Sequence, residues 1–186
     1  MGSEMCIRDR GNTVSNLSST RALRDVTAKH GGTYTASAVG EVNVVAAMKA
    51  NNAIIGGEGN GGIILPESHY GRDALVGIAL FLSLLAEKQM SVSVLKKTYP
   101  LYFMCKKKID LNPSIDVDAL LSSMEKSYQN ETLTTVDGVK IDFLDSWVHL
   151  RKSNTEPIIR IYTEATSQAQ ADALADRFIT ELKAFS

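Results

Sequence analysis

The sequence pattern changes between residues 97 and 100, and this change limits the folds that the 186 residues can adopt. Before it, short apolar segments such as Ala53-Ile54-Ile55 alternate with stretches of helical periodicity. That alternation is typical of an α/β unit with a parallel sheet. After it, clustered strand-like segments lie between two amphipathic helices. This favours a small α+β domain with an antiparallel sheet and helices on one face. We therefore predict two domains, residues 11–97 and residues 98–186.

The first half starts abruptly for an α/β unit, which would normally have an earlier strand and helix. Residues 1–10 match neither helical nor strand periodicity, so we treat them as a non-native or scar segment and leave them out of the fold. Strands are expected near residues 12–14, 33–36, 53–55 and 63–66, with helices between several of them. The helix that begins after Asp73 is apolar almost all round, which predicts packing on several sides.

In the second half, the run Lys106-Lys107-Lys108 falls in a predicted strand, residues 101–111. Lysines there are typical of an edge strand, where they discourage pairing with other chains. Asp137-Gly138 predicts a hairpin turn. Ser167 and Gln170 have the spacing of a capping box at the start of the last helix.

Composition excludes several classes of partner. The net charge of −1 gives no basic field for nucleic acid. The longest apolar run, residues 74–86, is too short to cross a membrane, and the start of the chain has no secretory signal. Cys6 and Cys105 have no metal-type partner spacing, which fits a reducing compartment. We expect a cytoplasmic protein.

A glycine-rich segment, residues 56–62, follows a predicted strand, and ligands bind at such strand ends in open α/β sheets. The order of its glycines is not the dinucleotide fingerprint, because no helix begins directly after it. Glu58, on this flexible backbone, can accept hydrogen bonds from sugar hydroxyls, with Asn60 beside it. The alternative is a flexible turn with Glu58 in solvent. Further on, Arg72 could reach a ligand or pair with Asp73 or Glu67, and the structural role is favoured.

A second polar loop, Arg151-Lys152-Ser153-Asn154-Thr155-Glu156-Pro157, lies between two predicted strands. Arg151 can give a bidentate charge-assisted contact, and the hydroxyls of Ser153 and Thr155 can complete an anion nest. Asn154 tolerates the left-handed conformation that such a turn can need. The loop therefore suits a phosphate, although a polar hairpin loop without a ligand is an open alternative.

The loop at 151–157 resembles the R-x-S-[GN]-T-E-P phosphate loop of the α-D-phosphohexomutases. The segment 57–62 resembles that family's G-E-x-S-G-H sugar loop, and Val39-Gly40-Glu41 resembles its V-G-[DE] turn. Residues 137–143 together with Trp147-Val148-His149-Leu150 resemble the family's approach to the phosphate loop. The match covers residues 11–186 in the family's order. It implies most of the third domain and all of the fourth domain of a four-domain mutase.

The resemblance implies interconversion of hexose 6-phosphate and 1-phosphate. Arg151, Ser153, Asn154 and Thr155 would grip the phosphate that does not react. Glu58 and Asn60 would bind the sugar of the phosphorylated hexose. Asn60 and Gly62 depart from the Ser and His that are usual in the sugar loop.

The sequence contains neither the T-x-S-H-N motif with the family's phosphoserine nor the D-x-D-x-R loop that binds Mg²⁺. No catalytic residue or metal ligand is therefore assigned to this chain. Mg²⁺ is expected only in the full-length enzyme, where domains 1 and 2 would be partners of the chain, and the chain alone is expected to be inactive. Two other functions are open: a stand-alone binding module for phosphosugars or other anions, and a nucleotide-binding α/β protein that uses the glycine loop.

Overall fold

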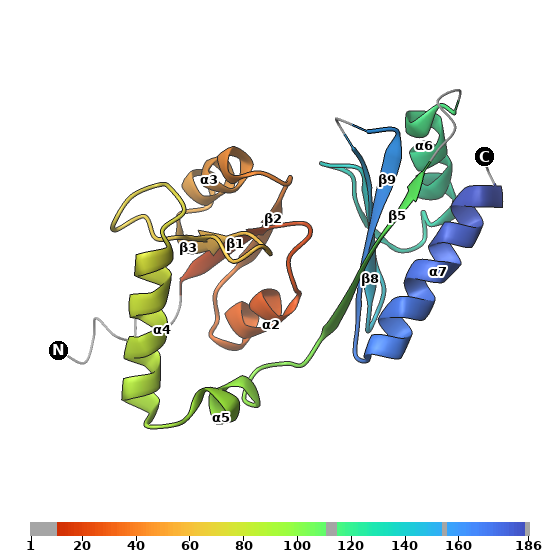
Figure 1. Ribbon diagram of the computed structural model, residues 1–186. Coiled ribbons are helices and arrows are strands. Elements are labelled where there is room, and N and C mark those ends of the chain that lie inside the picture. Colours follow the sequence, from red (N-terminus) through yellow and green to blue (C-terminus); the bar gives the residue numbers. More distant parts are fainter. Residues whose placement is uncertain (1–10, 111–114, 154–155, 185–186) are drawn as a thin grey trace. The chain divides into compact units, whose positions relative to one another are not determined.

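The computed structural model describes residues 11–110, 115–153 and 156–184. The chain divides into two units, Met1–Leu101 and Tyr102–Ser186, and each is described by itself (Figure 1). Among the described residues, none of the helices combines the length and the apolar character needed to span a bilayer.

The first unit is built on a mixed four-stranded sheet of order β2-β1-β3-β4. The central strand β1 runs parallel to β2 and β3, whereas β4 is antiparallel to β3. Helices α2 and α3 connect the parallel strands and lie on opposite faces of the sheet (Figure 1). The α/β expectation is confirmed. In chain order the elements are β1 (Asn12–Asn16), α2 (Ala22–Lys29), β2 (Tyr34–Ser37), α3 (Glu41–Ala50), β3 (Ala53–Gly57), β4 (Ile63–Ile64), α4 (Ala74–Lys88) and α5 (Val92–Lys96).

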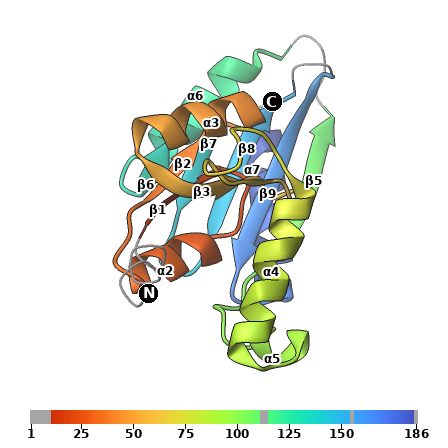
Figure 2. The same cartoon turned by 90° about the vertical axis from the view of Figure 1, so that its left-hand side faces the viewer.

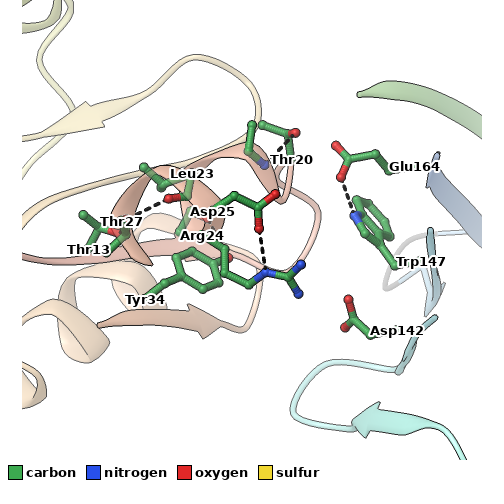
Figure 3. Close-up of polar contacts among 12 residues, drawn as sticks. Thr13, Thr20, Leu23, Arg24, Asp25, Thr27, Tyr34, Asp142, Trp147 and Glu164 are labelled. Atoms are coloured by element: carbon green, nitrogen blue, oxygen red, sulfur yellow. Dashed lines mark hydrogen bonds and ion pairs between the residues drawn. The ribbon is translucent and has the colours of Figure 1, made fainter. Parts of the chain in front are cut away.

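Close contacts fix the two helices on this sheet. The hydroxyls of Thr13 on β1 and Thr27 on α2 share a buried hydrogen bond of 2.7 Å (Figure 3). On the other face, Met48 of α3 lies against Gly56 of β3, where an added Cβ would lie 2.3 Å from the Met48 sulfur. Glycine at this strand position therefore allows α3 to approach the sheet.

Helix α4 begins as the sequence predicts but packs differently. Asp73 caps it, because its carboxylate accepts hydrogen bonds from the backbone N–H groups of Leu75 (2.9 Å) and Val76 (3.1 Å). The prediction that α4 packs on several sides is wrong: no residue of α4 is buried, and the exposed fraction of Leu75 is 77%. The helix packs on the short strand β4, close to Ile63, and Leu84 and Leu85 near its other end are only half-buried.

The second unit is a five-stranded antiparallel sheet of order β5-β9-β8-β7-β6. Helices α6 and α7 lie on the same face of this sheet (Figure 1), which confirms the α+β expectation. The lysine run lies on β5, at the sheet edge, as predicted (Figure 2). The elements are β5 (Phe103–Asp110), α6 (Val117–Ser127), β6 (Thr132–Thr134), β7 (Val139–Asp142), β8 (Trp147–Lys152), β9 (Ile158–Ala165) and α7 (Gln168–Ala184).

Local signals position the ends of these elements. The backbone N–H of Gln170 donates to the Ser167 hydroxyl at 3.3 Å, as the capping-box spacing predicts. Gly138 has φ +71°, and an added Cβ would lie 2.2 Å from the Leu150 carbonyl oxygen. This turn therefore needs glycine, and it places Asp137 beside the end of β8.

The helix-facing side of the second sheet carries a continuous core. It combines branched aliphatic residues of the strands with the apolar faces of the two helices. Its buried members are Cys105, Ile109, Leu120, Leu121, Met124, Val139, Ile141, Val148, Leu150, Ile159, Ile161, Ala165, Ala171, Ala175, Phe178 and Leu182. The alternate residues of β8, Trp147, His149 and Arg151, lie on the opposite side of the sheet.

Candidate functional site

Arg151 lies near the end of β8, at the start of the predicted phosphate loop. Its Nε donates to both carboxylate oxygens of Asp137, at 2.8 and 2.9 Å. Both side chains are largely buried, with exposed fractions of 22% for Arg151 and 18% for Asp137. This contact uses Nε, so the donors of the two terminal guanidinium nitrogens can serve a ligand. Such a fork is the geometry that binds a phosphate bidentately.

Ser153 is buried where the loop leaves β8. Its backbone N–H donates to the Ile158 carbonyl at 3.1 Å, and the N–H of Ile158 donates to the Glu156 carbonyl at 2.8 Å. These bonds close the loop between β8 and β9. The other two predicted phosphate contacts, Asn154 and Thr155, lie outside the described residues.

His149, two residues before Arg151 on β8, supports the turn at Asp137-Gly138. Its Nε2 donates to the backbone carbonyl of Asp137 at 2.7 Å, so the proton of the neutral ring is on Nε2. Burial is the main reason that the pKa of His149 lies below its ordinary value of 6.5. A neutral His149 therefore holds the Asp137 backbone, while the Asp137 carboxylate holds Arg151.

The predicted sugar-binding residue Glu58 lies in the loop after β3 and is nearly buried, with 5% of its side chain exposed. One carboxylate oxygen accepts a hydrogen bond from Asn16 Nδ2 at 3.1 Å. The other lies 3.4 Å from Nη1 of Arg72. Glu58 therefore does not extend freely into solvent, and its contact with a sugar stays a prediction.

Asn60 shapes the loop itself. Its Oδ1 accepts a hydrogen bond from the backbone N–H of Gly62 at 3.2 Å, which leaves its Nδ2 as the group able to donate to a sugar. Gly62 stands beside Arg72, and an added Cβ there would lie 2.5 Å from the Arg72 Cδ. Glycine at position 62, where the resemblance leads one to expect His, therefore accommodates the Arg72 side chain.

Arg72 does not pair with Asp73 or Glu67 as expected. Its Nε donates to Glu41 at 2.8 Å and its backbone N–H donates to the same carboxylate at 3.2 Å. Both hydrogen bonds lower the pKa of Glu41, and the bond from the Arg72 backbone has the larger effect. The physical reason for the difference is that Asp73 is occupied as the helix cap, while the chain brings Glu41 and Glu58 to the same place.

Glu41 and Arg72 line a surface pocket of about 530 Å³, together with residues of the glycine loop and the start of α4. The pocket offers the carboxylates of Glu41 and Asp73, the Arg72 guanidinium and backbone groups to a polar ligand. The sequence favoured a structural role for Arg72 over contact with a ligand, and it indicated Glu41 only as part of a turn motif. Their partnership spans distant segments, so no local pattern reveals it.

Among the residues that the structure describes, no three His, Cys, Asp or Glu side chains come together as a metal ion would require. The resemblance implies that the Mg²⁺ ligands come from domains 1 and 2 of the full-length enzyme.

Comparison with known proteins decides the family. The model of the α/β/α domain III of phosphoglucomutases and phosphomannomutases matches residues 3–102, and the model of their C-terminal domain matches residues 106–181. The chain belongs to the phosphohexomutase family. The two matched domains follow one another in the order of the two structural units.

Individual phosphohexomutases agree with this assignment. The chain is 34% identical over 172 residues to a phosphoglucosamine/phosphogalactosamine mutase of Sulfurisphaera tokodaii, covering 91% of this chain and 37% of that protein. It is also 34% identical to a phosphoglucomutase/phosphomannomutase of Thermococcus kodakarensis, covering 87% and 35%. The chain thus spans little more than a third of the length of these relatives.

A solved structure shows the same arrangement of elements. A phosphoglucomutase/phosphomannomutase family protein of Burkholderia thailandensis matches with a TM-score of 0.76 and 25% identity, over 97% of this chain and 39% of that protein. The fold of domains III and IV of the phosphohexomutases is therefore that of this chain.

Proposed function

We propose that this chain is the substrate-binding, C-terminal part of a phosphohexose mutase of the phosphoglucosamine or phosphomannose type. The whole enzyme would interconvert hexose 6-phosphate and hexose 1-phosphate in the cytoplasm. The observation that carries the proposal is the Arg151 guanidinium, held by Asp137 through Nε at the mouth of the phosphate loop. A preorganised fork of this kind binds a phosphate without first paying the entropy of its own ordering.

The proposed chemistry explains why a phosphate grip belongs on this part of the enzyme. A mutase that moves a phosphoryl group between C1 and C6 must hold the sugar in two orientations. In each orientation one phosphate lies away from the reacting end of the sugar. A single fixed site can therefore bind that phosphate in both orientations. Catalysis of phosphoryl transfer depends mainly on positioning and on charge stabilisation. Arg151, Ser153, Asn154 and Thr155 would supply that positioning.

The sugar would be read by the loop of the first unit. Glu58 would accept hydrogen bonds from hydroxyl groups that both orientations present, with Asn60 as a second contact through Nδ2. The reacting phosphoserine and the Mg²⁺ ligands would come from domains 1 and 2 of the full-length enzyme. No step of the reaction is assigned to a metal held by the described residues.

Binding of hexose phosphates to the 186-residue chain tests this proposal. Isothermal titration with glucosamine 6-phosphate, mannose 6-phosphate and glucose 6-phosphate should show binding of at least one of them. Arg151→Met should weaken it about tenfold, because a charge-assisted contact contributes about 1.5 kcal/mol or more. Arg177→Met is the matched control, since Arg177 is an exposed arginine of α7 paired with Glu181. Equal loss in both variants, or none in Arg151→Met, would argue against the phosphate grip.

A coupled isomerase assay tests the proposal that the catalytic groups belong to domains 1 and 2. The chain alone, supplied with hexose 1,6-bisphosphate and Mg²⁺, is expected to show no turnover. Mutase activity of the purified chain at any Mg²⁺ concentration would overturn the assignment of the catalytic groups to the other domains.

A further inference from the structure

The carboxyl ends of β1 and β3 meet at one edge of the first sheet. The two strands run parallel and side by side (Figure 1), and in their register Ser15 lies opposite Gly57. The next residues, Asn16 and Glu58, therefore lie beside one another where the strands end. Ligands of open α/β sheets bind at this edge. The partners that β1 gives to Glu58 thus belong to the surroundings of the proposed sugar site.

The Asn16 side chain makes two hydrogen bonds that differ in direction. Its Nδ2 donates to a Glu58 carboxylate oxygen at 3.1 Å, and its Oδ1 accepts from the Ser19 hydroxyl at 2.9 Å. An ionised carboxylate only accepts, so the amide must turn Nδ2 toward Glu58 and leave Oδ1 for the hydroxyl. The orientation of the Asn16 amide is therefore set by both partners.

These three side chains are shielded from water. Asn16 and Ser19 are buried, and the Glu58 side chain is nearly so. Water does not readily replace a hydrogen bond that is lost at a buried group, so each bond of this chain matters to the next. Buried polar networks that are satisfied in this way specify one arrangement of their side chains. Asn16 therefore restricts where the Glu58 carboxylate can lie.

The backbone holds the same two segments together. A Cβ added at Gly59 would lie 2.9 Å from the Ser18 carbonyl oxygen and 3.2 Å from the Ser19 Cα. Glycine at position 59 thus allows the loop after β3 to touch the turn after β1. The backbone N–H of Ser19 donates to the Asn16 carbonyl at 3.0 Å, which closes that turn. The turn supports Glu58 both through the backbone and through the Asn16 side chain.

Glu58 retains capacity to accept hydrogen bonds from a ligand. A carboxylate has about four lone-pair sites. Asn16 uses one site on one oxygen, and Nη1 of Arg72 lies 3.4 Å from the other oxygen. The remaining sites can accept from the hydroxyl groups of a sugar. The two protein partners therefore fix the carboxylate without saturating it.

We propose that Asn16 is a positioning residue of the sugar site. Oriented by Ser19, it fixes the Glu58 carboxylate where the hydroxyl groups of a hexose phosphate donate to it. This role rests on the proposed function, because it acts on the residue assigned to the sugar. It contributes to the affinity for a hexose phosphate and not to the affinity for the phosphate group alone, which is assigned to the Arg151 loop.

Isothermal titration of the 186-residue chain with hexose phosphate and with inorganic phosphate separates these contributions. Asn16→Leu keeps the approximate volume of the side chain and removes its donor and acceptor. It should weaken hexose phosphate binding about tenfold, as for a lost hydrogen bond to a charged group, and leave inorganic phosphate binding unchanged. Ser19→Ala removes only the hydroxyl that orients the amide, and it should weaken hexose phosphate binding about threefold.

Asn12→Leu is the matched control. Asn12 lies at the other end of β1, where its Nδ2 donates to the Asn51 carbonyl at 2.9 Å and its Oδ1 accepts from the Thr33 N–H at 3.0 Å. The variant loses two hydrogen bonds of the same strand but none that involves Glu58. It should bind hexose phosphate as the wild type does. Equal weakening in Asn12→Leu and Asn16→Leu would show a general effect on the strand and overturn the positioning role.

A double variant tests whether Asn16 acts through Glu58. Asn16→Leu combined with Glu58→Gln should bind hexose phosphate about as weakly as Glu58→Gln alone, because the effects of residues that act as one unit are not additive. Additive losses would overturn the proposal. Unchanged hexose phosphate binding in Asn16→Leu would overturn it too, as would unchanged binding in Ser19→Ala where circular dichroism shows that Asn16→Leu does not fold.

Failure of this role and failure of the proposed function have different signatures. If the wild type binds none of the hexose phosphates, the sugar site and the role of Asn16 are both rejected. If hexose phosphate binding depends on Glu58 and not on Asn16, only the positioning role is rejected.

Discussion

The guanidinium of Arg151 and the carboxylate of Asp137 face each other across the β7–β8 hairpin, with Nε between the two carboxylate oxygens. Asp137 is held in turn by the ring of His149, which donates to its backbone carbonyl. Because Gly138 makes the tight turn possible, the three groups form one support at the base of the phosphate loop. The support positions Arg151 without using its terminal nitrogens.

This arrangement predicts different effects for two changes of Asp137. Asp137→Asn retains an oxygen that can accept from Arg151 Nε, and it also removes a negative charge near a bound anion. We expect its affinity for the hexose phosphate that binds the wild type to stay within about threefold. Asp137→Ala removes the support altogether and should lower the affinity about tenfold. Isothermal titration distinguishes the two. Similar affinities for the wild type and Asp137→Ala would show that Asp137 does not position Arg151.

The buried His149 predicts a loss of stability in mild acid. Its folded-state pKa is lowered by burial, so the unfolded chain takes up the proton first as the pH falls. Above pH 6.5 the ring is neutral in both states and has no effect. Below that value the free energy of unfolding should decrease until the folded-state pKa is reached. His149→Gln, which can still donate to Asp137, should remove this part of the pH dependence. Urea unfolding at pH 7.5 and pH 5 measures it, and an unchanged slope in the variant would contradict the assignment.

Elements and capping signals could be predicted where the information is local. The hairpin at Asp137-Gly138, the capping box at Ser167 and the edge position of the lysine run all follow from neighbouring residues. The packing of α4 could not be predicted, because the apolar sequence of a helix does not identify the residues that pack against it. The partners of Arg72 were also missed: Glu41, Glu58 and Arg72 lie far apart in the sequence and meet only through the sheet topology.

In the candidate site, too, local features could be predicted from the sequence and contacts between distant segments could not. The pattern of residues 151–157 indicated a phosphate loop, yet the residues that hold Arg151 in place come from the preceding hairpin, where the sequence indicated only a turn. Likewise, no local pattern marks Asn16 and Glu58 as neighbours, because the register of β1 against β3 brings them together.

The Glu41–Arg72 contact predicts a measurable change in a carboxyl pKa. The backbone N–H and the side chain of Arg72 both lower the pKa of Glu41. Arg72→Met should leave the backbone hydrogen bond and remove the side-chain one, so the pKa of Glu41 should rise part of the way toward 4.5. Titration of the ¹³C-labelled carboxyl groups by NMR follows this change. Gly62→Ala should act in the same direction, because its Cβ would displace the Arg72 side chain. A Glu41 pKa that is unaltered in both variants would contradict the contact.

The two units should differ in resistance to proteolysis. Among the described residues, sixteen buried side chains form the core of the second unit, whereas five form that of the first. The first unit also exposes Leu75, Ile78 and Leu82 on α4, so fewer of its apolar groups contribute to stability. Brief digestion with subtilisin should therefore leave a fragment near residues 102–186, identified by mass spectrometry. Phe178→Ala, at the centre of the larger core, should cost about 3–5 kcal/mol and abolish the resistance. Survival of residues 11–96 with loss of residues 102–186 would show the opposite order of stability.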